Sequence, residues 1–232
     1  MENFPFAVVV FDLDGTLLDT APDLSRAINR MLVRLGRPQL EEERITRMIG
    51  RGMRVLVERA LTATGEATGP LVEKALPIFL EHYEAHIADQ TRPYSGAAEA
   101  LEQLSAQNTR LAICTNKPER LTRKLLTAFG WEKYFAAIVG GDTTAARKPD
   151  PLPLLTAIDK AGRGRAILIG DSINDTETAK AAGLPCVAVT FGYRDRPPEA
   201  LGATRLINRY DQLLPTLLEI SADNAEDSND RE

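Results

Sequence analysis

The chain has 232 residues, of which 44% are hydrophobic and 26% are charged. These proportions are ordinary for a folded protein and exclude disorder of the whole chain, and the length allows one large domain or a core with a modest insert. The formal net charge of -5 gives no general affinity for nucleic acid or an anionic membrane. We therefore expect a small-molecule partner, with a local basic site if that molecule is an anion.

No hydrophobic run approaches the length of a membrane span, and the first five residues lack the layout of a signal peptide. We therefore expect a cytoplasmic protein without membrane contact, as a monomer or a homodimer. Cys114 and Cys186 lie in hydrophobic runs, without a cysteine or histidine at ligand spacing nearby. We expect both to be buried thiols.

The first predicted strand is the hydrophobic run at 6–10, which is typical of a strand buried on both faces of a parallel sheet. Asp12 and Asp14 follow where this strand ends, and side chains two apart on an extended backbone point the same way. Gly15 allows a sharp turn after them. Two carboxylates this close repel each other, which favours a bound cation or a raised pKa on one of them. An isolated Asp-x-Asp is also common in loops, so the interpretation depends on residues further along.

Four helices and no strand are predicted between the first strand and residue 93. The first is expected to begin with Thr20 as N-cap and Asp23 at the capping-box position, and its hydrophobic stripe ends at Gly36. The last is expected to kink at Pro77. We expect this block to be an insert that closes over the edge of the sheet. The helices are expected at about 20–36, 41–48, 53–64 and 70–88.

From residue 93 onward, predicted strands and helices alternate, which is typical of a parallel α/β sheet. The predicted fold class is α/β, with a doubly wound parallel, Rossmann-like sheet core and an inserted all-helical cap. The core is expected at 1–19 and 93–220, the cap at 20–92, and a disordered acidic tail at 221–232. Strands are expected at 110–114, 137–139, 166–169, 185–189 and, at an edge, 204–207, and helices at 95–107, 118–129, 151–161 and 174–182.

Ligands of an open parallel sheet bind beyond the carboxyl ends of its strands, so polar residues at those ends are candidates for a site. Thr115 and Asn116 follow the second core strand and lead into a helix, where a hydroxyl and backbone N–H groups suit a phosphate. Either residue could instead only cap that helix. Lys148 follows the third strand beside prolines that stiffen the backbone, so its ammonium could be aimed at a fixed point. A solvated loop lysine is the alternative.

Asp171 and Asp175 follow the fourth strand, and Asp175 also lies where a helix begins. Helix capping would explain Asp175 but not both acids. With Asp12 and Asp14 they place four carboxylates at two strand ends without a soft ligand nearby, which favours Mg²⁺ over Zn²⁺. Phosphoryl transfer requires such a set, because a metal and a lysine neutralise charge, a hydroxyl orients oxygens and a carboxylate attacks.

Four segments resemble, in order, the motifs of the haloacid dehalogenase superfamily, and specifically of its phosphatases. These segments are 12–16, Thr115, Lys148 and 170–175. The resemblance extends over about residues 6–192, and the helical block matches the mobile cap that this family inserts after its first motif. It implies a Mg²⁺-dependent enzyme that hydrolyses a small phosphorylated metabolite.

The resemblance also implies a role for each acid. Asp12 would be the nucleophile that forms an aspartyl-phosphate, and Asp14 would protonate the leaving group and then activate water. The carboxylates of Asp12 and Asp171 and the backbone carbonyl of Asp14 would hold Mg²⁺, with Asp175 supporting these ligands from behind. The residues expected to hold the phosphoryl group or the substrate are Thr115, Asn116 and Lys148.

The aspartate at position 14 distinguishes the phosphatases of this superfamily from its dehalogenases and phosphonatases, which lack an aspartate there. Among the phosphatases, the sequence is most similar to phosphoglycolate phosphatases, at 12–20, 50–52 and 115–118. This implies 2-phosphoglycolate as the substrate. Arg51, or its neighbour Arg54, would meet the substrate carboxylate through paired hydrogen bonds, although a solvated arginine is the alternative for either.

Other functions stay open at this point. A phosphosugar mutase, or a phosphatase for pyrophosphate or a sugar phosphate, would use the same core residues; Thr16 favours hydrolysis over the mutase. A non-enzymatic phospho-acceptor is disfavoured, because signalling receiver domains are shorter and lack a helical insert after the first strand. His82 and His86 have the spacing of a zinc pair on a helix, but no acid or cysteine in the cap completes such a site, so we expect packing or surface positions.

Overall fold

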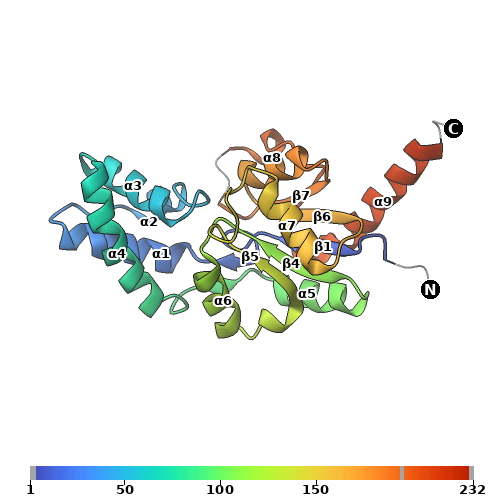
Figure 1. The fold of residues 1–232 in the computed structure, drawn as a ribbon, viewed down its shortest axis with the longest axis horizontal. Helices are drawn as coiled ribbons and strands as arrows, with labels where there is room; N and C mark the ends of the chain where they lie inside the picture. Colours follow the sequence, from blue (N-terminus) through green and yellow to red (C-terminus); the bar gives the residue numbers. More distant parts are fainter. Residues whose placement is uncertain (1–3, 194–195, 230–232) are drawn as a thin grey trace.

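The computed structural model describes residues 4–193 and 196–229 of the chain. Figure 1 shows a sheet with helices on both sides at one end of the molecule and a group of helices at the other. The main sheet has the strand order β5-β4-β1-β6-β7-β8, and all its pairs are parallel. The strands are β1 (Val8–Phe11), β4 (Arg110–Cys114), β5 (Phe135–Val139), β6 (Ala166–Gly170), β7 (Cys186–Val189) and β8 (Arg205–Ile207).

This strand order is that of a doubly wound, Rossmann-like sheet. Counted in chain order, the six strands lie as 3-2-1-4-5-6, so the direction of winding reverses between β1 and β6. The predicted fold class is therefore confirmed. Ligands of such sheets bind at the carboxyl ends of the strands that flank the reversal, which here are β1 and β6.

The helices that cover the sheet are α5 (Ala97–Ala106), α6 (Glu119–Ala128), α7 (Leu152–Ala161), α8 (Ile173–Ala181) and α9 (Leu213–Asn229). Strand β1 is buried on both faces, as its composition predicts. Val8 and Val10 belong to one hydrophobic cluster with α7 and α8, whereas Val9 and Phe11 belong to another with α5, α6 and α9. This alternation follows from the two-residue period of a strand.

The predicted strands and helices of the core are present, with small shifts at their ends. Strand β5 begins at Phe135 rather than at residue 137, because Phe135 already pairs with Leu111 of β4. Cys114 and Cys186 are both free and buried, as predicted.

The C-terminal segment differs from its prediction. The composition of residues 221–232 predicts disorder, but helix α9 continues to Asn229. A helix that is already nucleated gains one backbone hydrogen bond for each further residue, so it extends past its hydrophobic part. Disorder is therefore wrong up to Asn229, and residues 230–232 lie outside the described part of the chain. The buried side chains that anchor the start of α9 are Leu213, Leu217 and Ile220.

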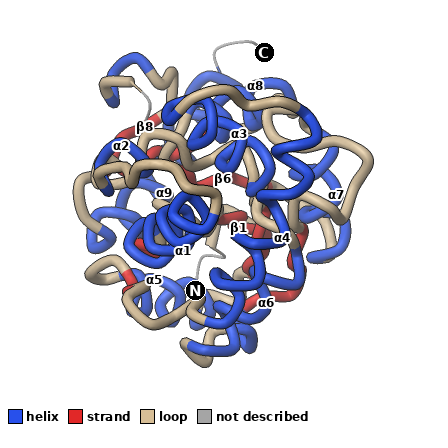
Figure 2. The backbone as a smooth tube through the Cα atoms, turned by 90° about the vertical axis from the view of Figure 1, so that its left-hand side faces the viewer, coloured by secondary structure: helices blue, strands red, loops and turns tan. Residues whose placement is uncertain are grey.

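The cap consists of helices α1 (Ala21–Arg34), α2 (Glu42–Thr46), α3 (Met53–Thr64) and α4 (Gly69–Ala85). Figure 2, viewed from the cap end, shows α1, α3 and α4 in front of β1 and β6. Pro77 lies inside α4, which continues on both sides of it. The cap therefore lies over the strand ends at which the sheet reverses.

Two short strands pair where the chain leaves and re-enters the core. They are β2 (Leu18–Asp19) and β3 (Arg92–Pro93), and they are antiparallel. Hydrophobic periodicity does not predict them, because two residues are too few to form a pattern. This pairing places the two segments that connect the helical insert to the sheet side by side. We propose that the chain divides at this point into a core (1–19 and 93–220) and a cap (20–92).

Helix α1 begins differently from the predicted capping box. Thr20 has a helical backbone conformation and its side chain makes no capping bond; its hydroxyl donates instead to Asp14 (Oγ1–Oδ1 2.7 Å). The N–H groups of Thr20 and Ala21 donate to the phenol oxygen of Tyr193 (2.5 and 2.8 Å), whose hydroxyl donates to Asp19. The predicted capping box is therefore wrong, because an N-cap side chain reaches the first N–H groups only from an extended backbone.

Asp23 joins the two ends of the cap instead of capping α1. Its carboxylate is buried and accepts hydrogen bonds from the N–H groups of Gln90 (2.9 Å) and Thr91 (2.7 Å) and from the Thr91 hydroxyl (2.8 Å). Hydrogen bonds to an ionised acceptor are stronger than neutral ones. Asp23 therefore fixes the start of α1 against the segment that returns to the core.

Replacement of Asp23 by alanine leaves the buried N–H of Thr91 without its acceptor and removes the acceptor that joins Gln90 and Thr91 to α1. We expect Asp23→Ala to lower the free energy of unfolding by roughly 2–3 kcal/mol, measured by urea denaturation through the fluorescence of Trp131, the single tryptophan. Glu81→Ala is the control, because Glu81 is exposed and pairs with the exposed Arg34 (3.6 Å). The control should change that free energy by no more than about 0.5 kcal/mol, and equal losses in the two variants would contradict this role of Asp23.

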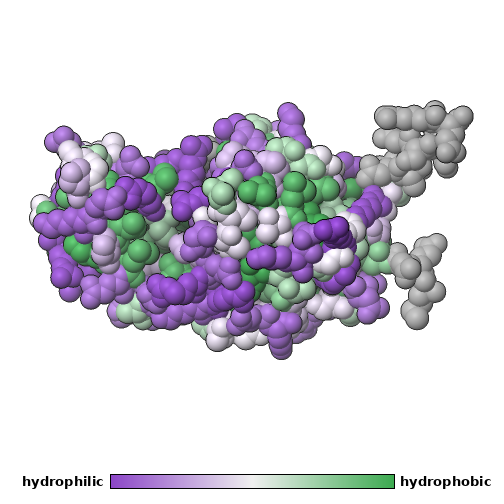
Figure 3. All heavy atoms as spheres, viewed as in Figure 1, coloured by the Kyte–Doolittle hydropathy of each residue, from purple (hydrophilic) through white to green (hydrophobic). Residues whose placement is uncertain are grey.

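The face drawn in Figure 3 is mostly hydrophilic over the cap and carries hydrophobic residues around α7. Leu152 and Leu155 of α7 are 43% and 47% exposed. Exposed leucines are common on folded proteins and need no special explanation. Within the described part of the chain, no helix is long and hydrophobic enough to cross a membrane.

Candidate active site

Asp12 and Asp171 meet where the sheet reverses. Strand β1 ends at Phe11 and β6 at Gly170, and the N–H of Asp12 donates to the carbonyl of Ile169 (2.9 Å). The parallel register therefore brings both acidic side chains to the same edge of the sheet. Both are buried, with only 6% of Asp12 and 2% of Asp171 exposed.

Asp12, Asp171 and Asp175 could together hold a metal ion. Their ligand atoms lie within 4.8 Å of one another, and no other group of this kind occurs among the described residues. Oδ1 of Asp12 is buried and accepts no aligned hydrogen bond from the described residues, although the ammonium of Lys148 lies 3.0 Å from it. Hard oxygen ligands suit a divalent cation, so these residues fit a divalent metal.

Burial and mutual repulsion disfavour the ionised forms of Asp12 and Asp171. Desolvation raises the pKa of Asp12 to about 6, against the lowering effect of Lys148. Desolvation and the charges of Asp175 and Asp12 raise the pKa of Asp171 well above its usual range. A divalent cation would relieve this repulsion, because an opposite charge favours the ionised form.

Lys148 lies between two of these acids. Its Nζ is 3.0 Å from Oδ1 of Asp12, an ion pair without hydrogen-bond alignment, and 2.6 Å from Oδ1 of Asp175. Burial opposes the ammonium charge, but the carboxylates of Asp12 and Asp175 outweigh it and raise the pKa of Lys148. Lys148 is therefore a charged, buried group of the site and not a solvated loop lysine.

Asp175 supports the site from the first turn of α8. Its Oδ2 accepts hydrogen bonds from the N–H groups of Asp171 (3.2 Å) and Ser172 (3.0 Å) and from the Ser172 hydroxyl (2.7 Å). Its Oδ1 accepts a hydrogen bond from Lys148. Asp175 is thus both a capping-box residue and a partner of Lys148, so both of its oxygens already have protein donors.

Asp14 lies beside this group but is held by a different lysine. Nζ of Lys117 lies 2.8 and 3.0 Å from the carboxylate oxygens of Asp14 and 2.7 Å from the phenol oxygen of Tyr83 in α4. The sequence predicts no role for Lys117, although this residue follows a strand and lies in the segment 115–118 that resembles the family. Nothing in the sequence connects Tyr83 with Asp14.

Thr115 and Asn116 are both buried at the end of β4 and line the same pocket. Nδ2 of Asn116 donates to the carbonyls of Gly50 (3.0 Å) and Lys148 (3.1 Å), and its Oδ1 accepts from the N–H of Lys148 (3.0 Å). Neither residue caps α6, whose N-cap position is Pro118. Asn116 therefore ties a cap loop to the loop that carries Lys148, while the Thr115 side chain faces the pocket.

Gly15 permits the close approach of the first motif to Asp171. Its φ of +85° favours glycine, and a Cβ at this position would lie 2.4 Å from Oδ2 of Asp171. The same oxygen accepts the N–H of Tyr193 (2.6 Å), and Oδ1 accepts the Thr16 hydroxyl (3.2 Å). The glycine that allows the turn after the acids thus also leaves room for the Asp171 carboxylate.

A pocket lies between the core and the cap. Its core side is polar and is formed by Asp12, Asp14, Thr115, Asn116 and Lys117. A ligand bound there lies between charged groups of the core and mainly hydrophobic groups of the cap, which limit the access of water. The cap residues that line it are Leu24, Ile49, Gly50, Gly52, Met53 and Leu56.

The two candidate arginines of the cap differ in their surroundings. Arg51 lies between two pocket-lining glycines, is exposed, and lines a neighbouring groove together with Ser172 and Tyr193 of the core. Arg54 instead pairs with Glu73 of α4 (2.6 Å). The structure therefore places Arg51 in a groove beside the pocket rather than in its lining, and holds Arg54 within the cap.

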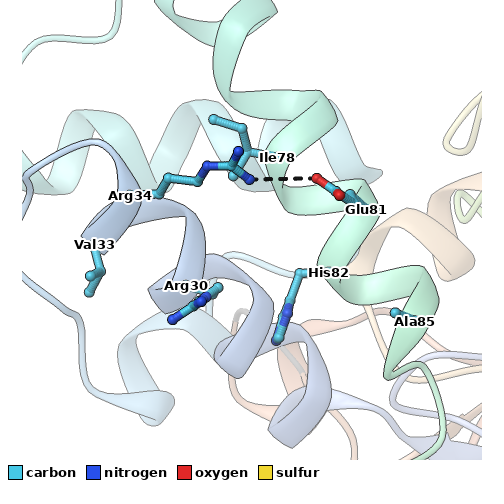
Figure 4. Close-up of a pocket in the computed structure, with 7 residues that line it drawn as sticks. All are labelled: Arg30, Val33, Arg34, Ile78, Glu81, His82 and Ala85. Carbon is cyan, nitrogen blue, oxygen red and sulfur yellow. Dashed lines mark ion pairs between the residues drawn. The ribbon is translucent and has the colours of Figure 1, made fainter.

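His82 and His86 lie in the cap, with ring centroids 4.5 Å apart. Figure 4 shows His82 near Arg30 in a surface pocket that also contains the ion pair between Arg34 and Glu81. Burial and the charges of His86 and Arg30 lower the pKa of His82. Nδ1 of His86 lies 2.9 Å from Oδ2 of Asp89, but among the described residues His82, His86 and Asp89 do not form a group that could hold a metal ion.

A Rossmann-like sheet, an inserted helical cap and a cluster of buried acids with a lysine and a hydroxyl define an α/β enzyme with a carboxylate-based active centre. The chain belongs to the haloacid dehalogenase-like hydrolase family, whose model matches residues 9–189. This match includes β1, the whole cap and the core as far as β7. The predicted superfamily and the predicted hydrolase class are therefore confirmed.

Similar proteins match nearly the whole chain. The chain is 43% identical over 215 residues to the phosphoglycolate phosphatase of Mesorhizobium japonicum, which covers 91% of this chain and 95% of that protein. It is 42% identical over 226 residues to that of Thiobacillus denitrificans, covering 94% and 96%. The crystal structure of a predicted phosphoglycolate phosphatase from Haemophilus somnus has a TM-score of 0.87 and 32% identity, covering 91% of this chain and 98% of that one.

The metal site can be tested without an activity assay. We expect MgCl₂ to raise the thermal unfolding temperature of metal-free protein, because an ion that binds only the folded state stabilises it, by about 2.7 kcal/mol at a hundred times its Kd. Asp171→Asn removes one ligand charge, and we expect it to raise the Kd for Mg²⁺ at least about tenfold. Asp159→Asn is the control, because Asp159 is exposed and pairs with Arg163. The same Mg²⁺ response in Asp171→Asn and in the native protein would exclude a metal site here.

Proposed function

We propose that this protein is a Mg²⁺-dependent phosphatase that hydrolyses 2-phosphoglycolate through an aspartyl-phosphate on Asp12. The observation that carries the proposal is the position of Asp12, whose buried carboxylate lies beside the ammonium of Lys148 and within reach of Asp171 at the reversal of the sheet. The relatives named as phosphoglycolate phosphatases support the choice of substrate, because they match this chain over nearly its whole length.

The first step transfers the phosphoryl group to the enzyme. A carboxylate oxygen of Asp12 attacks the phosphorus, and the bond between the phosphorus and the ester oxygen breaks. Protonated Asp14 gives its proton to that oxygen, so glycolate leaves as an alcohol. The ammonium of Lys148 and the hydroxyl of Thr115 neutralise and orient the phosphoryl oxygens.

The second step releases phosphate. Asp14, now ionised, takes a proton from a water molecule whose oxygen attacks the phosphorus. The bond between the phosphorus and Asp12 breaks, which restores the carboxylate of Asp12. Asp14 is then protonated again, so the cycle consumes one water molecule and leaves the enzyme unchanged.

The proposed ligands of Mg²⁺ are the carboxylates of Asp12 and Asp171 and the backbone carbonyl of Asp14. Magnesium, when bound, neutralises part of the charge of the phosphoryl group. Asp175 acts behind these ligands, because the ammonium of Lys148 pairs with its Oδ1 and three donors of Asp171 and Ser172 occupy its Oδ2. A set made only of oxygen ligands favours Mg²⁺ over Zn²⁺.

The proposed partner of the substrate carboxylate is Arg51. The carbonyl of Gly50, which precedes it, accepts a hydrogen bond from Asn116, so the loop that carries Arg51 is anchored to the core beside the pocket. Asn116 thereby serves substrate binding by holding this loop. A guanidinium pairs with a carboxylate through two parallel hydrogen bonds, and Arg54 is already engaged with Glu73.

Asp12→Asn tests the nucleophile. We expect this variant to lower phosphate release from 2-phosphoglycolate by about 10³-fold or more, because an amide cannot take the place of the attacking carboxylate. Release is measured at neutral pH with Mg²⁺ from 2-phosphoglycolate, pyrophosphate, glucose 1-phosphate and an aryl phosphate, with Asp159→Asn as the control. Equal, slow release from all four substrates would retain the phosphatase and reject 2-phosphoglycolate, and release from none would reject hydrolysis.

Arg51→Gln tests recognition of the substrate carboxylate. Loss of one paired contact is expected to raise the KM for 2-phosphoglycolate about tenfold. The KM for an aryl phosphate, which has no carboxylate, should change less than about twofold. Arg54→Gln is the matched control, and a similar rise in both arginine variants would argue against Arg51 as the specific contact.

A further inference from the structure

Lys117 is a buried charged residue that the two chemical steps do not use. Its side chain is fully buried, and its ammonium faces three acceptors: both carboxylate oxygens of Asp14 (2.8 and 3.0 Å) and the phenol oxygen of Tyr83 (2.7 Å). An ammonium has three N–H donors, so this arrangement uses all of them. The Asp14 carboxylate is thereby held at both of its oxygens.

Tyr83 brings this contact from the cap. It is fully buried in α4, its ring stacks on that of Phe79 (centroids 5.7 Å apart, planes at 7°), and Nζ of Lys117 lies 4.8 Å from its ring centroid. Lys117, by contrast, follows β4 in the core. The hydrogen bond between Lys117 and Tyr83 therefore exists only while α4 is docked on the core.

Stability does not account for this arrangement. Desolvation of a buried ammonium and a buried carboxylate offsets most of their attraction, so hydrophobic residues of the same volume would often be at least as stable. The ion pair between Lys117 and Asp14 instead fixes the position of a side chain. Lys117 and the Thr20 hydroxyl, which donates to Oδ1 of Asp14, together hold the Asp14 carboxylate at the wall of the pocket that also contains Asp12.

We infer that Lys117 is a positioning residue for Asp14, and that Tyr83 makes this positioning depend on the docked cap. The inference rests on the proposed function, in which Asp14 gives its proton to the leaving oxygen and so becomes the ionised carboxylate that Lys117 binds. When α4 withdraws, the ammonium loses one of its three acceptors, and its orientation toward the Asp14 carboxylate is no longer fixed. Proton transfer is thereby confined to the state in which the cap limits the access of water to the pocket.

The test compares leaving groups that need a proton with one that does not. 2-Phosphoglycolate and ethyl phosphate release alkoxide oxygens, which must be protonated, whereas 4-nitrophenyl phosphate releases a stable phenolate. We expect Lys117→Met to lower kcat/KM about 100-fold for both alkyl phosphates and less than about threefold for the aryl phosphate. Tyr83→Phe removes only the hydroxyl, and we expect the same selectivity at roughly 3- to 10-fold.

Two controls separate positioning from a general loss of docking. Lys124→Met breaks a neighbouring contact between α6 and α4, in which Lys124 donates to the carbonyl of Glu84 (2.8 Å). Lys124 does not contact Asp14, so this variant should leave the ratio of alkyl to aryl kcat/KM unchanged.

The second control is the double variant. Addition of Lys117→Met to Asp14→Asn should cause no further loss of kcat/KM for alkyl phosphates, because the effects of residues that act as one unit are not additive. Tyr83→Phe carries the test if Lys117→Met does not fold.

An equal loss for alkyl and aryl phosphates would overturn the inference and assign Lys117 a structural role. A loss confined to 2-phosphoglycolate, with ethyl phosphate unaffected, would overturn it in favour of direct contact between Lys117 and the substrate carboxylate. An alkyl-selective loss measured on ethyl phosphate, in a native protein that does not prefer 2-phosphoglycolate, would support the inference and reject only the proposed substrate.

Discussion

Repulsion among buried acids is the constraint on which this structure depends. Asp12, Asp171 and Asp175 place their ligand atoms within 4.8 Å of one another, and such a group is costly unless cations balance it. Lys148 supplies one positive charge from the loop after β5, and the all-carboxylate ligand group suits a second, divalent cation. The reversal of the sheet brings these groups together, because strands β1 and β6 are neighbours there and their ends open into the same crevice.

The cap is coupled to this charged edge through a few polar contacts near its linkers. The N–H of Tyr193 donates to Asp171, while its phenol oxygen accepts the first N–H groups of α1, so one residue joins a proposed metal ligand to the start of the cap. Asp14 is likewise bound both by Thr20 at the base of α1 and by Lys117, which contacts α4. Movement of the cap would therefore act on the acids directly, without a long chain of intermediate residues.

The sequence alone was sufficient to predict the strands of the sheet, the helical insert and which acidic residues follow the strands. A two-residue period marks strands and a period near 3.6 marks helices, and both patterns are local, so β1, β4, β6 and the cap helices follow from short windows of sequence. The position of the site follows from one topological rule, that parallel strands present their carboxyl ends at the same edge. Asp12, Thr115, Lys148 and Asp171 could therefore be grouped before any distance was known.

What the sequence determined by itself was which side chains follow which strands; the tertiary structure decided which partner each of them takes. Thr20 and Asp23 have the spacing of a capping box, yet Thr20 donates to Asp14 and Asp23 binds the end of the cap segment. No local sequence pattern identifies Tyr83, although its phenol oxygen is the third hydrogen-bond acceptor of the Lys117 ammonium. The physical reason is that a polar side chain has several acceptors of similar strength within reach, and the choice depends on backbone segments that only the folded chain brings together.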